Sequence, residues 1–167
     1  MIPQKFRKLF PGGIRPGIII PFAHKGEWAV HELLPVFFSQ AGKFNLDIAT
    51  FNVSEDSLRP IFFMNDGGQL LSTRFIFDNN IRRHKIDLLL FASGMATALH
   101  VSANHMKVML CYNSRLFMAV VGSANMNRNI RHEAGFITTE ENSFNHFQDY
   151  FNQVFENDSI PISIDEL

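Results

Sequence analysis

Apolar and polar residues alternate along this chain in short blocks that predict strands and helices in turn. Runs of strand-forming residues predict strands over 14–22, 46–51, 69–78, 86–91, 107–112, 116–121 and 134–138. Helical periodicity and capping signals predict helices over 27–41, 54–64, 79–85 and 125–131, and a last helix with phenylalanines at 144, 147, 151 and 155. Interleaved strands and helices predict an α/β fold, with a mixed sheet flanked by helices.

The length and composition predict one domain spanning residues 1–167. A chain of 167 residues that is 46% hydrophobic can form one sizeable core but is short for two typical domains. The most apolar stretch, 88–101, is interrupted by polar residues, so we expect no stable membrane association. The apolar run 17–22 is short for a signal peptide. Cys111 is the single cysteine, which excludes a disulfide within the chain and favours a reducing, cytoplasmic setting.

Two polar clusters flank a predicted hairpin in the second half of the chain. His105 and Lys107 stand at the start of one strand, two residues apart, and therefore project from the same side. A two-residue turn is predicted at 113–114, and the return strand, 116–121, leads into Gly-Ser-Ala-Asn at 122–125. The hairpin thus brings an imidazole, an amine, a hydroxyl and a carboxamide to one end. Such a set can supply a nucleophile together with donors for phosphate oxygens.

This pattern resembles the phospholipase D superfamily, whose signature is His-x-Lys, four residues, Asp, a spacer, Gly-Ser-x-Asn and a later acidic residue. The matching positions are His105, Lys107, Gly122, Ser123, Asn125 and Glu133. Tyr112 stands where the signature has its aspartate. Because side chains alternate along a strand, Tyr112 is predicted to face away from His105 and Lys107.

The resemblance implies a metal-independent phosphodiesterase in a phospholipase D-like domain, with no cofactor. It implies that His105 attacks phosphorus and forms a phosphohistidine, that Lys107 and Asn125 hold the non-bridging oxygens with help from Ser123, and that Glu133 accepts a hydrogen bond from the imidazole. The active site of the superfamily needs two copies of the motif, and this chain has one. The resemblance therefore implies a homodimer, with the two histidines facing across its twofold axis. The other histidines show no metal-ligand spacing.

The charge distribution favours an anionic partner for the first three quarters of the chain. The net charge is −1, but all 15 Lys and Arg and only 8 of the 16 Asp and Glu lie in residues 1–131, which gives that part +7. We expect Arg115, Arg128 and Arg131, near the motif, to contact substrate, and a basic cluster lies at 82–85. Small members of the resembled superfamily with a single motif are mostly nucleases, and the chain shows no basic amphipathic segment suited to a lipid surface. The resemblance therefore implies a nucleic-acid substrate and an endonuclease activity.

Two alternatives stay open from the sequence. A phospholipase D-type enzyme acting on phospholipid would use the same catalytic residues. A non-catalytic nucleic-acid-binding protein of the same fold would keep the basic surface, and the tyrosine at position 112 favours it. The motif fixes the chemistry but leaves open the choice between DNA, RNA and phospholipid, any sequence preference, the pathway, and the effect of Tyr112 on activity.

Overall fold

A computed structural model describes residues 2–163. One eight-stranded mixed sheet runs through the molecule, with the strand order β1-β7-β6-β5-β2-β3-β4-β8. The strands are β1 (Ile19–Lys25), β2 (Phe44–Thr50), β3 (Leu70–Asp78), β4 (Ala98–Ser102), β5 (Lys107–Tyr112), β6 (Phe117–Gly122), β7 (His132–Thr138) and β8 (Ile160–Pro161). Only β2–β3 and β3–β4 are parallel pairs; the other neighbours are antiparallel. The α/β fold with a mixed sheet is confirmed.

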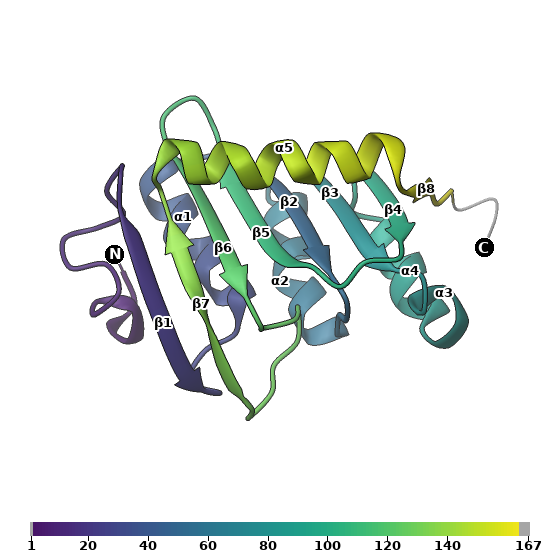
Figure 1. Ribbon diagram of the computed structural model, residues 1–167, viewed down its shortest axis with the longest axis horizontal. Coiled ribbons are helices and arrows are strands. Elements are labelled where there is room, and N and C mark those ends of the chain that lie inside the picture. Colours follow the sequence, from purple (N-terminus) through teal and green to yellow (C-terminus); the bar gives the residue numbers. More distant parts are fainter. Residues whose placement is uncertain (1, 164–167) are drawn as a thin grey trace.

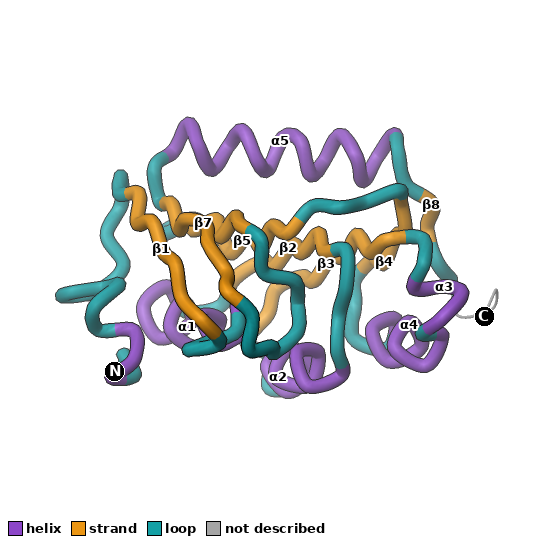
Figure 2. Tube along the Cα trace, turned by 60° about the horizontal axis from the view of Figure 1, so that its bottom comes forward, coloured by secondary structure: helices purple, strands orange, loops and turns teal. Residues whose placement is uncertain are grey.

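Helices cover both faces of this sheet, unequally. The helical segments are the 3₁₀ helices η1 (Gln4–Phe6) and η2 (Val30–Leu33), and α1 (Leu34–Ala41), α2 (Glu55–Asp66), α3 (Ile81–His84), α4 (Ile86–Ser93) and α5 (Glu141–Asn157). The long helix α5 lies alone across one face, whereas α1, α2 and α4 lie against the other (Figure 1). Figure 2 shows the three layers edge-on. None of the helices within residues 2–163 is long and apolar enough to cross a membrane.

Each face of the sheet has its own apolar core. The larger core fills the space toward α1, α2 and α4 and includes Phe37, Phe75 and Met109. The smaller one lies under α5, where Phe144 and Phe151 pack on side chains such as Leu110. The predicted spacing of phenylalanines on the last helix is confirmed by this packing, with Phe147 and Phe155 partly buried beside the same cluster.

The segment 86–91 is a helix, and its prediction as a strand was wrong. It forms most of α4, and the strand that follows it is β4, which the sequence pattern did not reveal. A short continuous apolar run fits a buried strand and a buried helix equally well. The sheet decides between them: β3 and β4 are parallel neighbours, and a parallel pair needs a crossover connection, which α3 and α4 supply.

Two predicted features around the motif also differ. Residues 125–131 form an irregular loop in place of a helix, because asparagine side chains bond to nearby groups: Asn129 Oδ1 accepts from Arg131 N at 2.8 Å, and Asn129 Nδ2 donates to Asn127 Oδ1 at 3.1 Å. The hairpin connection covers four residues, 113–116, and not two. There Asn113 Oδ1 accepts from the backbone N–H of Arg115 and of Leu116.

Three other predictions needed smaller changes. The first strand begins at residue 19, later than expected, because Gly17 adopts a φ of 76° in the loop before it. The helix predicted over 27–41 divides into η2 and α1, with Pro35 in the first turn of α1, where its missing N–H costs no hydrogen bond. The remaining strands and helices agree with the prediction to within a few residues at their ends.

Candidate active site

The ends of four neighbouring strands lie together and carry the polar motif residues. Strands β2 and β6 end there, and β5 and β7 begin there. The register pairs Thr50 with Lys107, Val108 with Val121, and Gly122 with Gly135. The predicted convergence of the two polar clusters at one end of the hairpin is therefore present. In Figure 1 these strand ends lie at the arrowheads of β2 and β6.

The segment before His105 is held in place by a buried asparagine. Asn104 Nδ2 donates to the backbone oxygens of Thr50, at 3.3 Å, and Ile76, at 3.0 Å, and its Oδ1 accepts from Met106 N at 2.8 Å. Its own backbone N–H donates to Asp78 Oδ2 at 3.2 Å. Asn104 thus ties the β4–β5 connection to two neighbouring strands. The sequence analysis missed this residue because its partners, Thr50 and Ile76, are distant in the sequence.

His105 and Lys107 lie together and are open to solvent. Lys107 Nζ is 3.1 Å from His105 Nδ1 and donates to the backbone oxygen of His105 at 2.9 Å. Partial burial lowers the pKa of Lys107, and the nearby Glu133 carboxylate acts in the opposite direction. The ring of Phe51, directly after β2, lies 4.7 Å from the His105 ring and 5.5 Å from Lys107 Nζ, measured to ring centroids.

Gly122 and Gly135 allow strands β6 and β7 to approach closely beside the site. A Cβ at Gly122 would lie 2.5 Å from Ala134 O, and one at Gly135 would lie 2.2 Å from Val121 O. No real side chain fits at such distances, so steric crowding explains why a glycine occupies this position of the Gly-Ser-x-Asn motif. The close approach places Ser123 next to Glu133: the serine hydroxyl donates to Glu133 Oε2 and accepts from Ala134 N at 3.1 Å.

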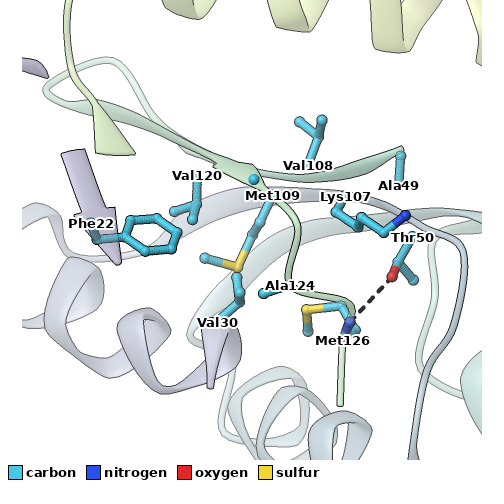
Figure 3. A pocket seen from close by; sticks show the side chains of 11 residues that line it. Phe22, Val30, Ala49, Thr50, Lys107, Val108, Met109, Val120, Ala124 and Met126 are labelled. Atoms are coloured by element: carbon cyan, nitrogen blue, oxygen red, sulfur yellow. Dashed lines mark hydrogen bonds between the residues drawn. The ribbon is translucent and has the colours of Figure 1, made fainter. Parts of the chain in front are cut away.

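The end of β2 and the residues that follow it orient the Asn125 side chain. Its Oδ1 accepts from Asn52 N at 3.1 Å and lies 3.5 Å from Thr50 Oγ1. Thr50 Oγ1 also accepts from Met126 N at 3.2 Å (Figure 3). Because the carbonyl side of the Asn125 amide is engaged in this way, its Nδ2 group is the side left to donate to an anionic ligand.

A small, mainly apolar cavity lies beneath these residues, and its lining includes Val30, Met109 and Met126 (Figure 3). Figure 3 shows Lys107 beside Thr50, its register partner, while Val108 points away from Met109 to the other face of β5.

Tyr112 lies on the same face of β5 as Val108 and Leu110, the face that α5 covers, as the alternation predicted. Its hydroxyl donates to Asp47 Oδ2 at 3.0 Å, and Asp47 forms a bidentate pair with Arg74 at 2.7 and 2.6 Å. Tyr112 is therefore on the opposite side of the sheet from Lys107.

The exposed surface around the motif is hollowed on two sides. A pocket of about 470 Å³ is lined by Phe51, Asn52, Ser123, Asn125, Asn127, Asn129, Arg131, His132 and Glu133. A second, of about 570 Å³, lies between His105 and helix α5 and is lined by residues including Met106 and Tyr150. Ser123, Asn125 and Glu133 thus share one pocket, and His105 borders the other. Within residues 2–163, the hydrogen bonds of the Glu133 carboxylate go to Ser123 and Asn129 and none goes to His105.

The three arginines expected near the motif have different positions. Arg131 lines the pocket of Ser123 and Asn125. Arg128 lies 3.6 Å from Glu32 in an ion pair. Arg115 is in the β5–β6 connection, at the end of the hairpin opposite to the site, so its predicted place near the motif was wrong. The cause is the hairpin itself, because sequence proximity to β5 does not say which end of the strand a residue is near.

No known protein-family profile and no curated protein matches the sequence. Solved structures do match. NucT from Helicobacter pylori superposes with a TM-score of 0.67 at 13% identity, covering 87% of this chain and 100% of NucT. Nuc from Salmonella typhimurium, a phospholipase D family member, gives 0.61 at 11% identity, covering 87% and 97%. Phosphatidylserine synthase from Haemophilus influenzae Rd KW20 gives 0.58 at 12% identity, covering 86% of this chain and 39% of the synthase. The fold that carries the polar cluster at the end of the hairpin is therefore phospholipase D-like.

Proposed function

We propose that this protein is a metal-independent phosphodiesterase, an endonuclease that hydrolyses nucleic acid at a homodimer twofold. The proposal depends on one observation: five polar motif residues lie at neighbouring strand ends of a phospholipase D-like fold. These residues are His105, Lys107, Ser123, Asn125 and Glu133. Each of these side chains reaches solvent or lines an open pocket, so a phosphate group has access to them. The fold without the cluster would not support the activity.

In the first step a ring nitrogen of His105 attacks phosphorus, and the bond from phosphorus to the leaving oxygen breaks. His105 of the partner subunit gives its proton to that oxygen. Lys107 and the Nδ2 group of Asn125 hold the non-bridging oxygens, on which negative charge increases in the transition state. The exposure of His105 leaves its ring open to a partner subunit.

In the second step His105 of the partner subunit takes a proton from water, and the hydroxide attacks phosphorus. The nitrogen–phosphorus bond breaks and both histidines return to their starting state. Ser123 and Glu133, joined by a hydrogen bond, stand beside the same pocket, where they position the phosphate and the charged groups around it. Accepting a hydrogen bond from an imidazole stays a prediction for Glu133.

The proposal is tested by hydrolysis in excess chelator. We expect single-stranded DNA, duplex DNA or RNA to be cleaved with EDTA present, because every role is assigned to a side chain, whereas a two-metal nuclease would stop. His105→Ala should lower the rate by more than about 10⁴-fold, since it removes both the nucleophile and the general acid. His146→Ala, an exposed histidine on α5, is the matched control and should keep full activity.

Two results would overturn the endonuclease proposal. Activity that disappears in EDTA and survives His105→Ala would contradict the mechanism. Cleavage of a phosphatidyl lipid without cleavage of any nucleic acid would favour the phospholipase alternative. Trapping acid-labile phosphate on His105 after rapid quenching would support the covalent intermediate directly.

A further inference from the structure

Phe51 is a partly exposed aromatic residue beside the proposed phosphate site. It follows the last residue of β2, and 39% of its surface is exposed. Its neighbours in the chain, Thr50 and Asn52, are occupied with backbone and side-chain hydrogen bonds that build the site. The phenyl ring is thus fixed at its base by an ordered segment while part of its surface stays in contact with water. An apolar ring held in this way is suited to contact a ligand.

The position of the ring relates it directly to the proposed phosphate site. Phe51 contacts the His105 ring and lies under the ammonium group of Lys107, and it lines the pocket that holds Ser123 and Asn125. A planar group resting on the phenyl ring would therefore be the immediate neighbour of a phosphate bound by His105 and Lys107. In a nucleic acid, the planar groups next to a phosphate are the bases.

A third pocket extends from Phe51 toward α3. It has a volume of about 240 Å³ and is lined by Phe51, Asn52, Asn80, Ile81, His84 and Lys85. This volume is below the usual range for drug-sized ligands, and it suits one flat ring system. Phe51 and Asn52 belong to both pockets, so the two form one path across the site.

The α3 end of this path is basic. Arg82, Arg83 and His84 are exposed and precede Lys85 in the chain. Lys85 Nζ donates to Asn52 Oδ1 at 2.6 Å and to the backbone oxygen of Val53 at 3.0 Å, both of which are neutral acceptors. Its charge is therefore held in place beside the pocket without a carboxylate among these partners. A path that runs from a phosphate site over an aromatic ring to a cluster of cations matches a chain of alternating phosphates and bases.

We propose that Phe51 is a specificity-determining residue that stacks on the base next to the scissile phosphate, and that the basic residues of α3 hold the adjacent phosphate. The substrate class is then single-stranded nucleic acid. In a duplex each base is already stacked on both faces, so only an unpaired base can rest on the ring. This inference depends on the proposed phosphodiesterase function and adds the strand type to it.

The test compares oligothymidylate with an oligomer of equal length that lacks all bases, using wild type, Phe51→Leu and Phe51→Trp. Wild type should cleave the thymidylate faster by about 5- to 150-fold, the range expected for one stacked base. Phe51→Leu should remove most of this ratio, and Phe51→Trp should keep it. Phe63→Leu, at a ring that is 64% exposed on α2 and lines neither pocket, is the matched control and should leave the ratio unchanged.

The outcomes separate this inference from the function it depends on. If wild type cleaves neither oligomer, the nuclease proposal fails. If it cleaves both equally, or if Phe51→Leu keeps the wild-type ratio, the stacking role is wrong and the phosphodiesterase stands. Faster cleavage of a duplex than of its separated strands would also contradict the inference, as would cleavage of a phosphatidyl lipid alone. Circular dichroism on each variant shows whether the fold is intact.

The α3 cations have their own readout in the salt dependence of binding. Replacing both Arg82 and Arg83 by Gln should reduce the slope of log affinity against log salt for oligothymidylate, by about 0.7 for each phosphate that the double variant no longer neutralises. Arg115→Gln removes an exposed arginine from the far end of the β5–β6 hairpin and should leave the slope unchanged. Equal slopes for wild type and the double variant would overturn the assignment of α3.

Discussion

Gly122 and Gly135 face each other across β6 and β7 at the point where both strands reach the site. We expect Gly122→Ala to cost about 1–3 kcal/mol of stability, the usual cost of overpacking, since the new Cβ would meet the backbone oxygen of Ala134 at 2.5 Å. Because relief of this contact would move Ser123, activity should fall as well. Gly94→Ala is the control, with nothing nearer than 3.6 Å to the added Cβ. Equal urea midpoints for both variants would contradict the prediction.

His31 is a buried histidine whose pKa is lowered from 6.5 to about 4, mainly by desolvation and further by Arg128 and Lys5, while Asp56 acts in the opposite direction. Between pH 6.5 and pH 4 the unfolded chain therefore binds a proton at this site that the folded chain does not bind. Stability must then fall as the pH decreases through that window, by up to about 3 kcal/mol from this residue.

The prediction is checked by urea unfolding at pH 7 and pH 4.5 for wild type and His31→Gln. The variant should lose less stability on acidification than wild type, because it lacks the group that is protonated only in the unfolded chain. His146→Gln, an exposed histidine, serves as the control and should behave as wild type. An identical loss in all three proteins would show that His31 contributes nothing to the acid response.

The sequence predicted which motif residues come together at one end of the sheet better than it predicted the residues that hold them in place. The spacing found His105, Lys107 and Asn125 because side-chain alternation and the hairpin fix which end of the sheet they reach. It could not find Asn104 or Phe51, since their roles come from neighbours distant in sequence: Asn104 bonds to β2 and β3. No local pattern contains such contacts.

At the scale of elements, a buried charge pair connects the central strands to helix α5. Asp47 on β2 is fully buried and paired with Arg74 on β3, and Arg74 Nη2 also donates to Asn152 Oδ1 on α5 at 2.9 Å. Arg74 lies 5.1 Å from the Phe151 ring centroid as well. The hydrogen bond to Asp47 is the main cause that raises the pKa of Arg74. The residue that departs from the motif, Tyr112, donates to this same carboxylate.

Restoring the aspartate of the motif by Tyr112→Asp should therefore damage the fold and not the site. A second carboxylate beside Asp47 would be poorly solvated and repelled, so we expect a loss of about 3 kcal/mol in unfolding free energy. Tyr112→Phe, which removes only the hydroxyl, should cost about 1 kcal/mol. Turnover per folded molecule should change little in both variants, because residue 112 is on the α5 face. A large gain in turnover for Tyr112→Asp would contradict this placement.

The elements that sequence analysis misjudged share one property: their local pattern is compatible with two structures. The apolar run at 86–91 became a helix because the parallel β3–β4 pair needs a crossover. The asparagine-rich segment 125–131 became a loop because its side chains bond to local groups, and Met126 also forms an isolated bridge with Val53. In both cases tertiary context decides, and periodicity alone does not include it.

For the whole molecule, the +7 charge of residues 1–131 overstates the positive surface near the site. Several of these cations are engaged elsewhere: Lys5 and Arg128 with Glu32, Arg59 with Glu55, and Arg74 with Asp47. Arg131 and the α3 cluster stay available beside the pockets. The charge count from the sequence therefore does not say where the unpaired cations lie, because ion pairing depends on contacts between distant segments.

The proposed two-histidine mechanism requires a dimer in which each protomer contributes one motif. We expect the mass from light scattering to be twice that of one 19.1 kDa chain at micromolar concentration. Heterodimers of wild-type and His105→Ala chains should have much reduced activity, since one histidine cannot serve as both nucleophile and acid. A monomeric mass together with full activity would contradict the dimer.

The pairing of β1 with β7 also has a consequence for how the chain acquires its structure. Residues 19–25 are synthesised well before residues 132–138, which form their only partner strand within the described sheet. Contacts so distant in sequence form slowly and leave an apolar strand unpaired meanwhile. Glu133 lies on that late strand, in register with His24. The candidate site is thus completed only after β7 has been made and has paired with β1 and β6, so we expect the proposed activity to appear only after that step.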